Sequence, residues 1–100
     1  MPTVLVDAEN VRRSRWPNMS REELEQRAHA WAAANGHEIV LVWEKRGESA
    51  DDWIARHARD HRPYWLVTSD RELRDRAGAD AERVIGGGSF LRELAPERRS

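Results

Sequence analysis

The sequence has no cysteine, and only one of its 17 basic residues, Lys45, is a lysine. Without cysteine the chain can form neither disulfide bonds nor thiolate zinc sites, and it has no cysteine nucleophile. Any bound metal would therefore have oxygen or imidazole ligands. The planar guanidinium of arginine suits phosphate groups, although a GC-rich codon bias would explain the excess of arginine equally well.

Long apolar runs are also missing, and none of those present could cross a bilayer. Thr3 begins a strand-like run with no preceding secretory signal. We therefore expect a cytoplasmic protein without a membrane partner. The formal net charge is only −1, which argues against indiscriminate coating of nucleic acid, because such binding depends on neutralised phosphates. One hundred residues, 39% of them hydrophobic, have the size and composition of one globular domain.

Short apolar runs alternate with helical patterns along the whole chain. Buried strands are expected at residues 3–7 and 38–44, a third strand at 64–68 and a weaker last strand at 83–85. Helices are expected at residues 20–35, 49–60 and 69–77 and from residue 89, with a loop at 8–18. The alternation predicts one α/β domain, a three-layer sandwich whose four-stranded parallel sheet has the order 2-1-3-4.

Capping residues define the helix ends. Ser20 and Ser69 each precede a glutamate by three residues, which is typical of a capping box, and Ser49 is a further N-cap. Asn35-Gly36 is expected to end a helix in the left-handed conformation. Four tryptophans lie in periodic elements and are predicted to be core residues: Trp31, Trp43, Trp53 and Trp65.

Acidic residues gather at one predicted edge of the sheet. Asp7 and Glu44 end the first two strands, Asp70 follows the third, and Asp51 and Asp52 open a helix that starts from the same edge. Taken singly, Asp51 and Asp52 could complement a helix dipole, Asp70 could do the same or cap its helix, and Asp7 could simply end a strand. Together, carboxylates in one crevice repel one another unless a cation offsets their charge. Oxygen ligands suit Mg²⁺ or Mn²⁺, which can polarise a phosphodiester and activate water.

Several segments resemble a known family. Val6–Asn10 resembles the "VDxxN" signature of NYN domains, Gly47–Ile54 the "GESADDxI" helix start of their YacP-like branch, and Val67–Leu73 its "VTSDRELR" segment. Ser89–Leu94 is similar to the closing helix of the family. These segments cover nearly the whole chain in the family's order. The sequence therefore resembles a shortened YacP-like NYN domain, within the PIN-like endoribonucleases.

The resemblance implies a PIN-like (Rossmannoid) nuclease domain over residues 1–96, followed by a polar tail at 97–100. It implies metal-binding roles for Asp7, Asp51 and Asp70, supported by Asn10 and Ser69. We further expect Asp52 and Glu44 to orient water molecules. The residues expected to hold RNA are Arg12, Arg13, Arg15, Trp16, Arg46 and Arg71.

Some alternatives remain open at this level. The chain passes almost directly from Glu44 to Gly47, where relatives carry an additional stretch, so a non-catalytic RNA-binding or ribosome-associated module of the same fold is the competing function. The kind of RNA and the oligomeric state, including a homodimer, are not determined. Trp16 could stack on an unpaired base or fold back over the core.

Three other kinds of site are less well supported. His57 and His61 are one helical turn apart but lack the glutamate of a zinc-protease motif. The glycines at 86–88 are followed by no lysine and are expected to form a flexible connection rather than a phosphate loop. Asp7 and Glu9 lack the threonine and lysine that an aspartyl-phosphate phosphatase would need.

Overall fold

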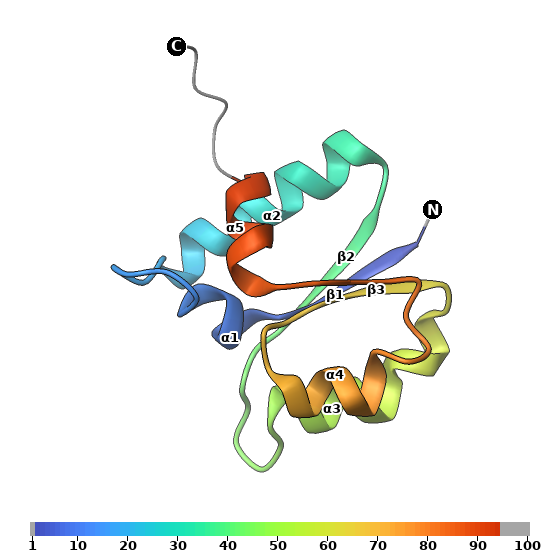
Figure 1. Cartoon of the computed structure of the whole chain (residues 1–100). Helices are drawn as coiled ribbons and strands as arrows, with labels where there is room; N and C mark the ends of the chain where they lie inside the picture. Colours follow the sequence, from blue (N-terminus) through green and yellow to red (C-terminus); the bar gives the residue numbers. More distant parts are fainter. Residues whose placement is uncertain (1, 95–100) are drawn as a thin grey trace.

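The computed structural model describes residues 2–94, which form three layers with a parallel sheet in the middle (Figure 1). Strands β1 (Thr3–Asp7) and β3 (Tyr64–Val67) lie at the centre, and β2 (Glu38–Val42) and β4 (Arg83–Ile85) lie at the edges. The order is β2-β1-β3-β4 and every pair is parallel, so the predicted sheet is confirmed.

Helices cover both faces of the sheet. Their bounds are α1 (Ala8–Arg12), α2 (Arg21–Asn35), α3 (Ala50–His57), the 3-10 turn η1 (Ala58–His61), α4 (Arg71–Ala77) and α5 (Gly87–Leu94). Helices α1, α2 and α5 cover one face, and α3 and α4 cover the other (Figure 1). Val4 and Val6 pack in the core beneath the first group, whereas Leu5 packs in the core beneath the second. Successive side chains of a strand point to opposite faces, so the fully buried β1 contributes to both cores.

Strand β2 differs from the prediction of a fully buried strand ending at Glu44. It ends at Val42, and its first residue is exposed while the next three are half-buried. The reason is topological, because β2 is an edge strand with a neighbour on one side only. The four tryptophans predicted as core are likewise half-buried and pack at the margins of the two cores.

Three helix starts also differ from the prediction. Residues 8–12 form α1 instead of a loop, because Ala8 and Val11 are buried against the sheet in a helix too short to show periodicity. Helix α4 is capped by Asp70 rather than Ser69. Helix α5 begins at Gly87 rather than Ser89, and its first amide donates to Ser69 Oγ at 2.8 Å. Gly87 and Gly88 are thus helical and not a flexible connection.

Other predicted helix ends are confirmed. Ser20 and Ser49 accept hydrogen bonds from the amides of Glu23 and Asp52. Gly36 ends α2 with φ at 73°, a left-handed conformation that glycine adopts without a Cβ penalty. Within residues 2–94 no helix has the length and apolar character to span a bilayer. The predicted domain end at residue 96 and the tail at 97–100 lie outside the described residues.

Candidate active site

Five carboxylates lie around one hollow at the carboxyl edge of the sheet. Asp7 is the last residue of β1, Glu44 follows β2 by two residues, Asp51 lies in the first turn of α3 and Asp70 caps α4. They line a hollow of about 230 Å³ together with Glu9, Asn10 and Arg13. The parallel topology explains this convergence, because the ends of neighbouring parallel strands meet at one edge.

Asp7 is the buried member of this group, with 5% of its surface exposed. Burial raises the pKa of its carboxyl from 3.8 to about 6, and the hydrogen bond from Thr68 opposes this rise. The negative charges of Asp51, Asp70 and Glu44 raise the pKa further. A carboxylate is costly in this position because both desolvation and like charges disfavour its ionised form.

Thr68 is a site residue that the sequence analysis missed. Its buried hydroxyl donates to Asp7 Oδ2 at 2.9 Å and accepts from the Asp70 amide at 3.0 Å, so it joins two of the acidic residues. Asn10 has a similar bridging role, since its Oδ1 accepts from the Ser69 amide at 2.8 Å. These bonds hold the start of α1 against the turn after β3. The only signal in the sequence was a polar residue ending an apolar strand.

Two of the other carboxylates also accept hydrogen bonds from backbone amides nearby. Asp70 Oδ1 accepts from the amides of Glu72 and Leu73, at 2.9 and 3.4 Å, which is the N-cap interaction of α4. Glu44 is exposed, and its Oε1 accepts from the Ala50 amide at 3.3 Å, at the start of α3. The turn that carries Glu44 is thereby tied to the helix that carries Asp51.

Two predicted site residues are not brought into the hollow. Asp52 is exposed and accepts from Arg76 Nη1 at 3.0 Å, and this hydrogen bond, with that of Ser49, lowers the pKa of Asp52. Ser69 is exposed, and its Oγ is occupied by the Gly87 amide. Ser69 therefore positions α5, and Asp52 links α3 to α4.

The arginines predicted to bind RNA divide into two groups. Arg12 and Arg13 both pair with Glu9, at 2.6 and 2.7 Å, and Arg12 also donates to the Met19 carbonyl. Arg12 is thus held within the fold, whereas the Arg13 side chain is 65% exposed and lines the hollow. Glu9 was missed because the helical spacing that pairs it with the arginines lies in the segment predicted as a loop. The remaining candidates are exposed: Arg15, Trp16, Arg46 and Arg71.

Trp16 is 86% exposed, which excludes the alternative that it folds back over the core. It lies in the turn that joins α1 to α2, beside Arg15. An indole in this position is available to stack on an unpaired base.

Comparison with known proteins places the fold. No protein-family model matches the chain, and a search of curated proteins finds no match. Among solved structures, a mutant form of Rae1 (YacP) from Bacillus subtilis superposes with a TM-score of 0.74, over 94% of this chain and 75% of that chain. This chain has the fold of Rae1. The sequences are 20% identical, so the likeness to Rae1 is one of fold. The three-layer fold with sheet order 2-1-3-4 that the sequence predicts is therefore confirmed.

The central role of Thr68 yields a prediction about the pKa of Asp7. Thr68→Val keeps the shape of the side chain but removes the hydrogen bond that lowers this pKa. We expect the pKa of Asp7 to rise above about 6 and the free energy of unfolding to fall by about 1–3 kcal/mol, because two buried partners lose their bond. Carboxyl NMR titration measures the pKa. Thr68→Ser, which retains the hydroxyl, is the matched control, and equal behaviour of the two variants would refute the prediction.

Proposed function

We propose that this chain is a divalent-metal-dependent endoribonuclease. The observation that carries the proposal is the convergence of Asp7, Glu44, Asp51 and Asp70 on one hollow, at the edge of the sheet where parallel α/β folds bind ligands. The sequence resemblance to YacP-like NYN domains and the fold shared with Rae1 (YacP) support the same activity.

The chemistry of the hollow fits a hard cation. Its carboxylates and the Asn10 amide offer oxygen ligands of the kind that Mg²⁺ and Mn²⁺ prefer. Burial, and to a smaller extent the charges of Asp51, Asp70 and Glu44, raise the pKa of Asp7, and a bound divalent ion would favour its ionised form. Within residues 2–94 no three histidine or acidic side chains are already arranged to coordinate one ion. The residues that would hold an ion are Asp7, Asp51 and Asp70, which line the same hollow.

When bound, the ion would supply Lewis-acid activation of the phosphodiester and of the attacking water. The chain itself would position the substrate. Arg13 lines the hollow and could contact a phosphate oxygen, and its pairing with Glu9 restricts where its guanidinium lies. Glu44 would accept a hydrogen bond from water at the solvent side. Asn10 would hold the turn that presents Asp70. Asp52 is not part of the proposed site, because it pairs with Arg76 and does not line the hollow.

The exposed basic residues of the α1–α2 turn would bind the RNA backbone. Arg13 lines the hollow and Arg15 directly precedes Trp16 in the chain, and both arginines are exposed. Arg46 and Arg71 extend from the turn before α3 and the start of α4. An RNA strand crossing the hollow would thus meet positive charge on more than one side, which offsets the repulsion between its phosphates and the carboxylates.

The direct test is incubation of the purified chain with labelled RNA in Mn²⁺ or Mg²⁺, with EDTA as the reference. Internal cleavage that depends on the ion is the expected result. RNA binding without cleavage under any divalent ion would refute the nuclease proposal and support the non-catalytic RNA-binding module instead. Absence of both activities would refute both.

The basic turn gives a second prediction. Arg13→Ala with Arg15→Ala should weaken RNA binding and reduce the slope of log K against log salt by about 1.4, because about 0.7 counterions are released for each neutralised phosphate of a single strand. A filter-binding series at several salt concentrations in EDTA measures both quantities. Arg59→Ala with Arg62→Ala removes two exposed arginines near the opposite edge of the sheet and is the control. The turn lies outside the interface if the two double variants behave alike.

A further inference from the structure

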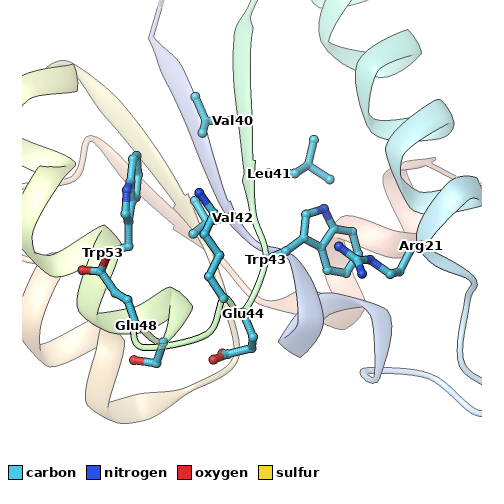
Figure 2. A pocket seen from close by; sticks show the side chains of 10 residues that line it. Arg21, Val40, Leu41, Val42, Trp43, Glu44, Glu48 and Trp53 are labelled. Atoms are coloured by element: carbon cyan, nitrogen blue, oxygen red, sulfur yellow. The ribbon is translucent and has the colours of Figure 1, made fainter.

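A second hollow runs along the open edge of β2, beside the carboxylates. It measures about 260 Å³ and wraps around the strand, with Trp43 and Arg21 on one side and Trp53 on the other (Figure 2). Its floor is the apolar part of the edge strand, which is half-buried at Val40 and Leu41 and buried at Val42. This volume is below the range of about 300–1,000 Å³ of most small-molecule sites and suits a group the size of one planar base.

Arg21 and Trp43 form a cation–π pair on the side of the hollow near α2. The Arg21 guanidinium lies 4.4 Å from the centre of the Trp43 ring, and Trp43 Nε1 donates to Glu25 Oε2 at 2.6 Å, which fixes the plane of the indole. Among residues 2–94 no acidic side chain forms an ion pair with Arg21. Its charge is therefore available to a ligand.

The two hollows are neighbours, since Glu44 lines both. The sheet register explains the proximity, because Asp7 pairs with Val42 and Trp43 is the next residue. Lys45, the only lysine of the chain, lines the second hollow just beyond Glu44. A strand whose phosphate lies at Asp7 would therefore have its neighbouring nucleotide beside Trp43, with Arg21 and Lys45 near its backbone.

We propose that the hollow formed by Arg21, Trp43 and the edge of β2 binds one unpaired base of the RNA strand, so that the substrate is single-stranded at this position. The inference rests on the proposed function, since it places the neighbouring phosphate at the carboxylates. The planar Arg21–Trp43 pair offers a stacking surface for a base, and arginine planes and aromatic rings are the side chains on which unpaired bases stack. Bases inside a duplex are already stacked and could not enter.

The chain contains a matched control for this site. Arg83 lies 5.0 Å over the ring of Trp65, and Trp65 Nε1 donates to Glu82 at 3.3 Å, so the same three kinds of side chain meet there. Trp65 is near the amino end of β3 and Arg83 begins β4, which places this pair at the opposite edge of the sheet from the carboxylates.

The experiment measures binding of a fluorescein-labelled, unstructured 12-nucleotide RNA by anisotropy in EDTA, where no metal-dependent cleavage occurs. Trp43→Leu and Arg21→Ala should each weaken binding by at least about fivefold, equivalent to about 1 kcal/mol for one stacked base. Trp65→Leu and Arg83→Ala should change it by less than twofold. Pairing the RNA with its complement should weaken binding to the unmodified chain and remove the difference between Trp43→Leu and the unmodified chain.

An abasic scan assigns the effect to a base. Removing the base at one position of the oligonucleotide should weaken binding to the unmodified chain and cause no further loss in Trp43→Leu. The inference is overturned by a flat scan, by unchanged affinity of both variants, or by equal losses in the Trp65 and Arg83 controls. Thermal melting verifies that Trp43→Leu folds. If Trp43→Leu does not fold, Arg21→Ala still tests the inference, because Arg21 is exposed. Binding with this pattern but without cleavage in Mn²⁺ would refute the nuclease proposal alone, whereas cleavage without this pattern would refute only the base site.

Discussion

Asp7→Asn and Asp51→Asn should each reduce Mn²⁺-dependent RNA cleavage by at least about a hundredfold, equivalent to about 3 kcal/mol of lost transition-state stabilisation. Each substitution removes a negative oxygen ligand from the proposed ion while keeping the size of the side chain. Rates of cleavage of a labelled RNA at saturating Mn²⁺ measure the effect. The loss should exceed any loss of RNA binding, because the carboxylates act on the ion and not on the RNA backbone.

Asp52→Asn is the matched control for this experiment. Asp52 is adjacent to Asp51 in α3, but it is exposed and pairs with Arg76 outside the hollow. Its substitution should leave cleavage within about threefold of the unmodified chain, because surface ion pairs contribute little to stability. Full activity of Asp51→Asn, or an equal loss in Asp52→Asn, would contradict the assignment of the site.

Asp7→Asn should also stabilise the metal-free protein at neutral pH. The pKa of Asp7 is about 6 in the folded chain against 3.8 for an unperturbed carboxyl, so the folded state binds the proton more tightly than the unfolded state. The resulting stability is fully present below about pH 3.8 and is lost as the pH rises through about 6. At 1.36 kcal/mol for each pKa unit the loss is about 3 kcal/mol at most, and solvent and salt in the open hollow reduce it to about 1–3 kcal/mol.

Denaturant titrations of both proteins between pH 4 and pH 8 in EDTA measure this effect. Asparagine can still accept the hydrogen bond from Thr68, so Asp7→Asn should gain about 1–3 kcal/mol over the unmodified chain at pH 8 and little at pH 4. If the difference in unfolding free energy between the two proteins did not change with pH, ionisation of Asp7 would not be its cause.

Added Mn²⁺ should make the unmodified chain more stable than Asp7→Asn, which reverses the order expected without metal. At about a hundred times its dissociation constant the ion should stabilise the unmodified chain by about 2.7 kcal/mol and Asp7→Asn by much less. Substitution of Asp70 is less informative in this experiment, because its carboxylate also caps α4. Its loss would change both the affinity for the ion and the stability of the helix. If Mn²⁺ leaves the melting temperature of the unmodified chain unchanged, the hollow does not hold the ion.

The sequence was sufficient to predict the strands, their order and the edge at which Asp7, Asp51 and Asp70 meet. The physical reason is that these features depend on short-range sequence patterns and on the right-handed crossover between parallel strands. Apolar runs define buried strands, and serine caps such as Ser20 and Ser49 define where α2 and α3 begin. The parallel arrangement then brings the strand ends together without any knowledge of side-chain contacts.

The tertiary structure decided which polar groups near that edge belong to the hollow. The sequence predicted both Asp51 and Asp52 as site residues, but the packing of α4 beside α3 gives Asp52 an arginine partner outside the hollow. The role of Thr68 depends on bonds between residues 61 positions apart, which no local pattern encodes.

Burial at the edges of the sheet also required the fold. The apolar run of β2 reads like that of β1 in the sequence, yet β1 is central and fully buried, whereas β2 leaves an open edge beside Trp43. What the sequence by itself determined is therefore the set of elements, their order and the kinds of residues at the functional edge. What only the tertiary structure decided is which side chains are desolvated, paired or open to a ligand, because these properties depend on neighbours that are distant in the chain.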